Sequence, residues 1–333
     1  MTTKSLIVFD MDGVIIDVSG SYRETVRQTA RLFFKGARSW RDLPDPLFSL
    51  SDLANVKQSG GLNNDWDLTL VAIDLLFNLV KGVTKVEDPD PWSSYSKTIT
   101  QCDVAGLAQC LKSTKNPLSS LRIKTGKSKN NIVTGFYSGD VGSGNIIKQI
   151  FQEIYLGKDL FETTYGIPTK AYHSKGYITR EKLLIDHAQL ERLSKYNILA
   201  VATGRPEAEA DYALDFFKLK KFFTMIYSLD DCLREEKKIR DEKGVKVSLS
   251  KPNPFMLDTI AALQKPAVSG HYYVGDMPDD MVTAKRSKAG FKAIGILISS
   301  PDKDNLKKNL LKSGADHIVD DFAELMSLLA SGK

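Results

Sequence analysis

The sequence predicts an α/β protein with a doubly wound parallel sheet and an inserted, mainly α-helical second domain. Two observations lead to this fold class. A short apolar run near the N-terminus, Leu6–Phe9, stops abruptly at an aspartate, as expected of a buried strand in a parallel sheet. From about residue 180 onward, short strand-like runs alternate with helical patterns, which is typical of a sheet covered on both faces.

The elements after residue 180 are assigned from these patterns. The expected strands are short apolar runs at Ile198–Ala202, Phe223–Tyr227, Tyr272–Val274, Ala293–Ile296 and His317–Val319. The expected helices show apolar residues recurring on one side and span 180–195, 205–218, 253–264, 278–289, 303–312 and 321–331. The charged stretch 234–251 is predicted to be an exposed loop, a short helix or disordered chain.

Residues 19–180 lack this alternation of strands and helices and are predicted to form the inserted domain. Helices are expected at 21–35, with Ser21 at N-cap spacing from Glu24, and at 66–81 and 145–156. The stretch 82–135 is rich in Ser, Thr, Lys, Pro and Gly and receives no assignment. The first domain is therefore expected to comprise residues 1–18 and 181–333.

Composition excludes several classes of protein. A chain of 333 residues is long enough for about two domains. Hydrophobic residues make up 42% and charged residues 26%, so collagen-like, coiled-coil and wholly disordered chains are excluded. No apolar run approaches the roughly 20 residues of a membrane span, so no membrane partner is expected. Three cysteines are too few and odd in number for a disulfide framework, which predicts a cytoplasmic location.

Positive charge is concentrated in residues 104–139. This stretch has no acidic residue and six basic ones, namely Lys112, Lys115, Arg122, Lys124, Lys127 and Lys129. We expect a solvated loop, with a positive surface that attracts an anionic substrate as the alternative. The sequence has no zinc-finger spacing and no aromatic pattern typical of RNA-binding domains, so no nucleic-acid partner is expected.

Two carboxylates follow the first strand, in the segment Asp-Met-Asp-Gly-Val at 10–14. Asp10 and Asp12 lie two residues apart and therefore leave the strand end on the same side. Ionising both is unfavourable unless a cation neutralises them, and Mg²⁺ prefers such oxygen ligands. Gly13 permits the tight turn that follows. The alternative is a simple turn or helix cap.

Two further segments carry polar groups at a strand end or a helix start. Thr203, in Ala-Thr-Gly-Arg-Pro at 202–206, offers a hydroxyl and a backbone N–H to phosphate oxygens. A plain helix N-cap is the alternative. Lys251 begins the segment Lys-Pro-Asn-Pro at 251–254, whose prolines restrict the backbone and start a helix. The direction of Lys251 would thereby be fixed, and its ammonium could neutralise a phosphoryl group.

The last segment is Gly-Asp-Met-Pro-Asp-Asp at 275–280, after another apolar strand. Asp276 could complete a metal site. Asp280 could steady the lysine or a metal-bound water, whereas Asp279 could cap the following helix. Which of these two is the second acid of the segment stays open at this point.

The order and spacing of the four segments resemble the motifs of the haloacid dehalogenase-like hydrolase superfamily. The family's first motif, Asp-x-Asp-Gly-[Val/Thr], matches 10–14, and its fourth, Gly-Asp-x-x-x-Asp, matches 275–280. Its Ser/Thr and Lys motifs match Thr203 and Lys251. The extended form Asp-Gly-Val-Ile-Ile-Asp at 12–17 is similar to the branch of phosphoglycolate phosphatases and β-phosphoglucomutases.

This resemblance implies a Rossmann-like catalytic core with an inserted helical cap that selects the substrate. Asp10 would be the nucleophile that forms an aspartyl-phosphate, and Asp12 the general acid and base. Thr203 and Lys251 would stabilise the transferring phosphoryl charge. The implied Mg²⁺ ligands are Asp10, Asp12 through its backbone carbonyl, Asp276 and Asp280. An aspartate at position 12 argues against the dehalogenases themselves.

Substrate contacts are expected at Gly204 and Arg205, beside Thr203, and in the inserted domain. For Arg205 a surface role is the alternative. Candidates in the inserted domain are Asn63, Asn64 and Asp65, which follow a Gly-Gly pair on a loop and could contact the substrate. The alternative is that they cap the helix that begins near Trp66. Lys175 lies near the point where the chain returns to the core and could contact an anionic group of the substrate.

The expected function is Mg²⁺-dependent hydrolysis of a small phosphorylated metabolite by a monomer or homodimer. The alternatives are a phosphotransferase of the phosphomutase type and a non-catalytic regulatory protein with the same fold. The resemblance does not identify the metabolite.

Overall fold

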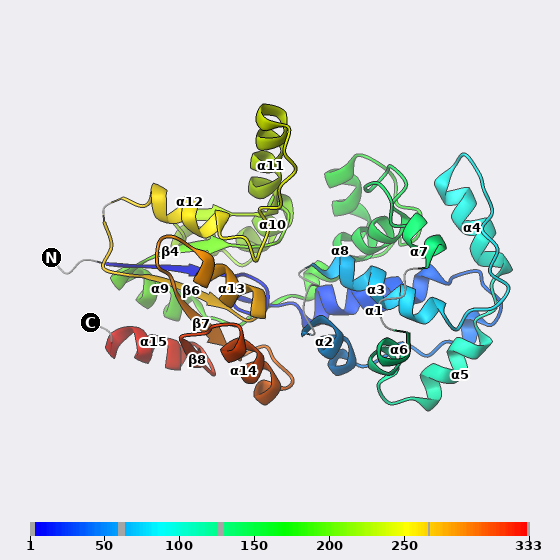
Figure 1. The fold of residues 1–333 in the computed structure, drawn as a ribbon, viewed down its shortest axis with the longest axis horizontal. Coiled ribbons are helices and arrows are strands. Elements are labelled where there is room, and N and C mark those ends of the chain that lie inside the picture. The colour runs from blue at the N-terminus through cyan, green and yellow to red at the C-terminus, as the bar shows by residue number, and fades with distance from the viewer. Residues whose placement is uncertain (1–3, 59–63, 126–129, 266, 332–333) are drawn as a thin grey trace. The chain divides into compact units, whose positions relative to one another are not determined.

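The computed structural model describes residues 4–58, 64–125, 130–265 and 267–331. Contacts divide the chain into two compact units. The core unit comprises Met1–Val18 and Lys182–Lys333, and the helical unit comprises Ser19–Glu181. Figure 1 shows the elements of each unit along the chain.

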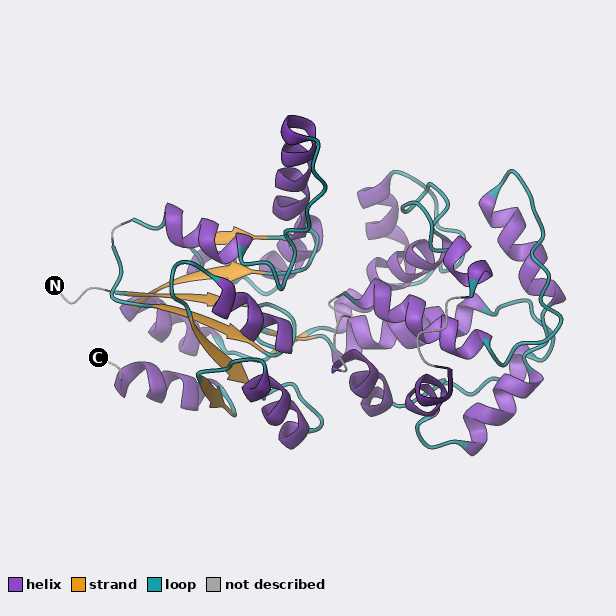
Figure 2. Ribbon diagram, viewed as in Figure 1, coloured by secondary structure: helices purple, strands orange, loops and turns teal. Residues whose placement is uncertain are grey.

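The core unit is built on a six-stranded parallel sheet with the order β5-β4-β1-β6-β7-β8 (Figure 2). Its strands are β1 (Ser5–Phe9), β4 (Asn197–Ala202), β5 (Met225–Tyr227), β6 (His271–Gly275), β7 (Lys292–Ile296) and β8 (His317–Val319). β1 is central, because Val8 pairs with Ala200 of β4 on one side and Tyr273 of β6 on the other. This arrangement confirms the predicted α/β class.

Helices cover both faces of this sheet, as Figure 2 shows. The helices of the core unit are α9 (His187–Tyr196), α10 (Glu207–Phe216), α11 (Leu229–Lys243), α12 (Phe255–Leu263), α13 (Pro278–Arg286), α14 (Lys303–Lys312) and α15 (Phe322–Ser331), with a 3-10 turn η4 (Lys220–Phe222). Val8 belongs to an apolar cluster that includes Met256 and Met281, whereas the ring of Phe9 packs against Phe223 and Phe322. β1 is thus buried on both sides, which explains its continuous apolar run.

A small two-stranded ladder carries the chain out of the core unit and back. β2 (Ile16–Asp17) pairs antiparallel with β3 (Lys182–Leu183). This pairing makes the prediction of a helix from residue 180 wrong. α9 begins only at His187, after the side chain of Asp186 accepts a hydrogen bond from the Gln189 N–H at 2.7 Å.

The helical unit contains eight α-helices and three shorter turns among its described residues. They are η1 (Ser19–Arg23), α1 (Glu24–Phe33), η2 (Trp40–Asp42), α2 (Leu50–Gln58), α3 (Asp65–Phe77), α4 (Pro91–Gln101), α5 (Ala105–Ser113), α6 (Pro117–Thr125), α7 (Asn131–Gly135), α8 (Ile146–Tyr165) and η3 (Tyr177–Arg180). α1 packs against α3 and α8. Aromatic rings fill this core, and the rings of Tyr22 and Tyr155 stack at 4.1 Å.

The structure assigns the stretches that the sequence left open and corrects two expectations, the loop at the basic segment and the N-cap at Ser21. The unassigned stretch 82–135 is mainly helical, so most of the basic segment lies on helices; Lys127 and Lys129 lie outside the described residues. The charged stretch 234–251 begins inside the 15-residue helix α11. Ser21 does not cap α1, because its hydroxyl donates to Glu181 at 3.0 Å. Among the residues that the structure describes, no helix is long and apolar enough to cross a membrane.

Candidate active site

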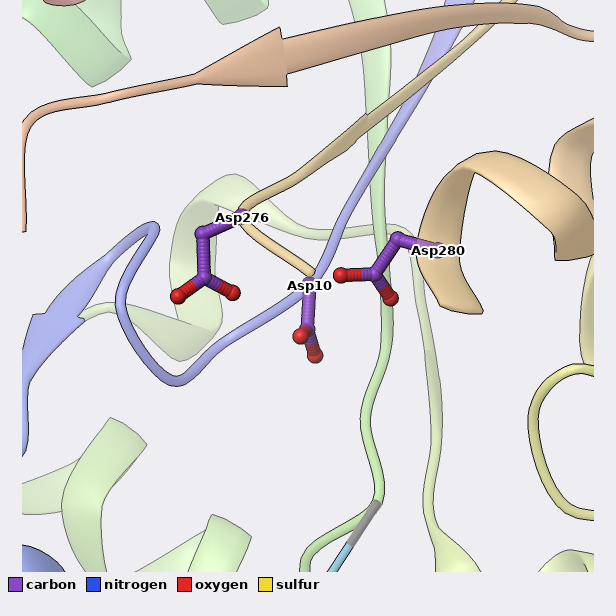
Figure 3. A group of neighbouring side chains, drawn as sticks. All are labelled: Asp10, Asp276 and Asp280. Atoms are coloured by element: carbon purple, nitrogen blue, oxygen red, sulfur yellow. The ribbon is translucent and has the colours of Figure 1, made fainter. Parts of the chain in front are cut away.

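Three predicted site residues follow three adjacent strands of the core unit. Asp10 comes directly after β1, Thr203 after β4 and Asp276 after β6. Because parallel strands end at the same edge of a sheet, these side chains gather there. All three are buried, and the carboxylates of Asp10, Asp276 and Asp280 converge in Figure 3.

Lys251 joins two of these carboxylates. Its Nζ lies 2.7 Å from Oδ1 of Asp10 and 2.9 Å from Oδ1 of Asp280. Asp280 is held from its other side as well, because the Met277 N–H donates to its Oδ2 at 3.0 Å. Asp280, rather than Asp279, is therefore the acid of the last segment that reaches the lysine.

Tyr273 is a member of this cluster that the sequence analysis missed. Its hydroxyl donates to Oδ1 of Asp280 at 2.9 Å, and Nζ of Lys251 lies 5.4 Å from the centre of its ring. The side chain is fully buried in β6. Its polar hydroxyl in an apolar strand, three residues before Asp276, was the available signal. It supports Asp280 and, through Asp280, the lysine.

Burial and charge shift the pKa values of this cluster. Burial raises the pKa of Asp10 to about 7; Lys251 opposes the shift, whereas the charges of Asp280 and Asp12 add to it. For Lys251, burial acts to lower the pKa, but the charges of Asp10 and Asp280 outweigh it and hold the pKa well above 10.5. Lys251 is thus a permanent cation beside a carboxylate that is costly to ionise.

Two glycines leave room for the carboxylates. Gly13 has a φ of +76°, and a Cβ at this position would lie 2.1 Å from Oδ2 of Asp276. A Cβ on Gly275 would lie 2.3 Å from Cβ of Asp280. Position 13 therefore needs glycine for two reasons. The turn requires a positive φ, and the backbone passes too close to the Asp276 carboxylate for a side chain to fit.

The residues present fit a divalent cation. Asp10, Asp276 and Asp280 each offer a carboxylate oxygen, and these oxygens lie within 4.8 Å of one another. Oxygen donors of this kind are the ligands that Mg²⁺ prefers. When all are ionised, these carboxylates and Asp12 carry four negative charges against the two positive charges of Lys251 and Arg205. One divalent cation would neutralise the difference.

Asp12 and Arg205 meet in the core unit. Nε and Nη2 of Arg205 lie 2.6 and 2.5 Å from Oδ1 of Asp12. The hydroxyl of Thr203 accepts a hydrogen bond from the Arg205 N–H at 3.2 Å, so Thr203 also serves the local turn. Gly204 lies between them with open space at its Cβ position. The Arg205 side chain is only 1% exposed, so a surface role is excluded, whereas its role in substrate binding stays a prediction.

The other predicted substrate contacts lie in the helical unit. Asn64 is the N-cap of α3, since its side chain accepts from the Asp67 N–H at 2.7 Å, as the alternative interpretation had it. Asn63 lies outside the described residues. Lys175 is exposed, and its backbone pairs with that of Gly157.

Asp65 is a buried partner of two cations. Its Oδ1 lies 2.6 Å from Nη1 of Arg23 and 3.1 Å from Nζ of Lys57. Burial acts to raise its pKa, but the charges of Arg23 and Lys57 dominate and hold the pKa below 3.8. This ion-pair cluster ties η1, α2 and α3 together.

We expect Asp65→Asn to destabilise the helical unit by roughly 2–4 kcal/mol at pH 7, because two largely buried cations lose their anion. A carboxyl whose pKa is depressed on folding contributes stability above its unfolded pKa, and this is lost as the pH falls through the folded pKa. The difference from wild type should therefore narrow below pH 3.8. Urea unfolding at pH 7 and at lower pH measures this difference in the free energy of unfolding. Asp159→Asn, at an exposed site on α8, is the control; equal losses in both variants would contradict this role.

Comparisons with known structures agree with this fold. One X-ray structure, a structural genomics target, aligns with a TM-score of 0.65 and 20% identity over 98% of each chain. A phosphatase from Thermococcus thioreducens aligns with a TM-score of 0.50 and 19% identity over 92% of this chain and 99% of its own. At these identities the likeness concerns the fold. A search of curated proteins finds no match.

A comparison with protein families matches part of the core unit. Residues 186–296 match the family described as haloacid dehalogenase-like hydrolase. This stretch lies entirely within the core unit and contains Thr203, Lys251, Asp276 and Asp280, whereas Asp10 and Asp12 lie outside it. Residues 186–296 of the core unit are therefore similar to the haloacid dehalogenase-like hydrolases.

Proposed function

We propose that this protein is a Mg²⁺-dependent phosphatase that hydrolyses a small phosphorylated metabolite through an aspartyl-phosphate. One observation carries the proposal. Asp10 lies at the end of the central strand, with its Oδ1 held by Nζ of Lys251 at 2.7 Å and by the Met11 N–H at 2.8 Å. We take its other oxygen, Oδ2, which neither donor uses, as the attacking atom.

The reaction would proceed in two steps. In the first, Oδ2 of Asp10 attacks phosphorus, the bond to the ester oxygen breaks, and Asp12 gives the leaving oxygen a proton. In the second, water attacks the same phosphorus, Asp12 takes a proton from the water, and the bond between phosphorus and Oδ2 of Asp10 breaks, which releases inorganic phosphate and regenerates the Asp10 carboxylate. Lys251 and Thr203 would stabilise the negative charge of the transferring group in both steps.

The carboxylates of Asp10 and Asp276 would hold the Mg²⁺, together with the backbone carbonyl of Asp12. Bound there, the ion would offset the negative charge of the phosphate and of the carboxylates as they approach each other. Asp280 offers an oxygen within the same cluster, but it also binds Lys251. We therefore assign Asp280 to positioning the lysine as well as to the metal environment.

The helical unit would select the substrate. It leaves and rejoins the core unit through the β2–β3 ladder, which begins only four residues after Asp12. The Gly13 N–H donates to the Ile16 carbonyl at 2.8 Å, so the loop that carries both aspartates leads directly into the insertion. An insertion at this place can change substrate preference without altering the sheet that positions the catalytic groups.

Release of phosphate from p-nitrophenyl phosphate and from a panel of phosphorylated metabolites tests the proposal. We expect turnover with Mg²⁺ and loss of turnover when a chelator removes the ion. Asp10→Asn should reduce turnover to background, because the amide is not a nucleophile, while thermal unfolding shows that the fold is retained. Turnover in Asp10→Asn would contradict the assignment of the nucleophile.

Two other results would favour the alternatives. Isomerisation of a sugar 1-phosphate without release of inorganic phosphate would indicate a phosphomutase. Absence of turnover across the panel, with Mg²⁺ binding retained, would indicate a non-catalytic protein. Both are distinguished from the phosphatase by measuring phosphate and isomerised product in the same samples.

A further inference from the structure

Arg205 has an unusual environment for an arginine. Only 1% of its side chain is exposed, and it is the largest fully buried side chain of the described residues. Its Nε and Nη2 both contact Oδ1 of Asp12, at 2.6 and 2.5 Å. The side chain of Asp12 is 29% exposed, so its carboxylate is fixed on one side and accessible on another.

The backbone around Arg205 is fixed at both of its polar groups. Its N–H donates to the hydroxyl of Thr203 at 3.2 Å, and its carbonyl accepts from the Leu229 N–H at 2.9 Å. Thr203 is itself tied to the end of β5, because its N–H donates to the Tyr227 carbonyl at 2.9 Å. The guanidinium therefore approaches Asp12 from a rigid support at the edge of the sheet.

The geometry of the pair restricts the direction of the carboxylate. A guanidinium presents its donors in a planar fork, and two donors that meet one oxygen limit the rotation of the side chain that carries it. A lysine ammonium supplies the charge without the fork. A buried cation also needs an anion close by, so the pair satisfies both partners.

We propose that Arg205 is a positioning residue that aims the carboxylate of Asp12 at the leaving oxygen of the substrate. This rests on the proposed phosphatase function. In the first step the proton passes from Asp12 to the ester oxygen as the P–O bond breaks, so a misplaced Asp12 slows departure of a poor leaving group. A good leaving group, such as p-nitrophenolate, departs without that proton and needs Asp12 less.

The test compares p-nitrophenyl phosphate with an alkyl phosphate, β-glycerol phosphate, using the full-length protein with Mg²⁺. We expect Arg205→Gln to lower kcat for the alkyl ester by on the order of 10²-fold and for the aryl ester by only a few fold. Arg205→Lys should recover part of the alkyl activity. Arg234→Gln, at an exposed arginine of the same unit that pairs with Glu207, should change neither.

A double-mutant cycle separates positioning from a structural role. If Arg205 acts through Asp12, adding Arg205→Gln to Asp12→Asn should cost little further alkyl activity. Equal losses for both esters, or additive losses in the double variant, would overturn the proposal while wild-type turnover still upholds the phosphatase. A wild type that hydrolyses no ester would contradict both. If Arg205→Gln does not fold, Arg205→Lys provides the test. A ratio of alkyl to aryl kcat in Arg205→Lys equal to that of wild type would also overturn the proposal.

Discussion

Lys251→Met is expected to remove turnover and to destabilise the core unit. Lys251 is only 10% exposed, and its Nζ lies between Oδ1 of Asp10 and Oδ1 of Asp280. Methionine fills a similar volume without the charge, which leaves two buried carboxylates facing each other. Removing one member of a buried ion pair costs about 3–5 kcal/mol. In the proposed mechanism Lys251 stabilises the transferring phosphoryl group, and its loss should lower kcat by on the order of 10³-fold.

Urea unfolding and phosphate release measure the two effects. Lys246→Met, at an exposed lysine in the same connecting segment, provides the control and should resemble wild type. The charge of Lys251 contributes stability below pH 10.5, and this is lost only as the pH rises through its raised pKa. The destabilisation should therefore be present throughout the neutral range. A Lys251→Met protein as stable and active as wild type would show that the pair with Asp10 has no energetic role.

Gly157→Ala is expected to destabilise the helical unit by roughly 3–5 kcal/mol, the sum of backbone strain and steric overlap. Gly157 interrupts α8 with φ 75° and ψ 171°, a conformation that is essentially restricted to glycine. A Cβ there would lie 2.1 Å from the backbone nitrogen of Gly176. Neither backbone can move easily, because the Lys158 N–H next to it donates to the Ser174 carbonyl at 3.1 Å.

Gly166→Ala is the matched control for this prediction. Gly166 also has a positive φ, 67°, but its ψ of 17° is in the ordinary left-handed region and nothing lies within 4 Å of a Cβ. Alanine there should cost only about 1–2 kcal/mol. Urea unfolding followed by circular dichroism compares the two. Similar losses in both variants would mean that the contact with Gly176 does not restrict the chain.

Strands of the core unit could be predicted well because each contains a short apolar run. β1, β4 and β6 are buried between helices on both faces, so the apolar run shows where each strand ends and the polar chemistry begins. The helix α11 was harder to predict. Cys232 is its one fully buried side chain, so the apolar periodicity that identifies a helix is missing.

Local patterns also failed where a distant partner decided the structure. Ser21 had the spacing of an N-cap, but its hydroxyl donates to Glu181, 160 residues away. Lys182 and Leu183 belong to a helical pattern in sequence, yet β2 pairs with them. In both places a tertiary hydrogen bond replaced the local one, and no sequence window contains both partners.

The sequence by itself determined which side chains stand at the strand ends, because the boundary between an apolar run and a polar motif is a local property. Only the tertiary structure decided how those side chains pair. Lys251 pairs with Asp280 and Asp10, and the hydroxyl of Tyr273 donates to Asp280. Arg205 pairs with Asp12, which lies 193 residues earlier in the chain. Such pairings depend on which strands become neighbours, and that is fixed by packing of the whole sheet rather than by any one segment.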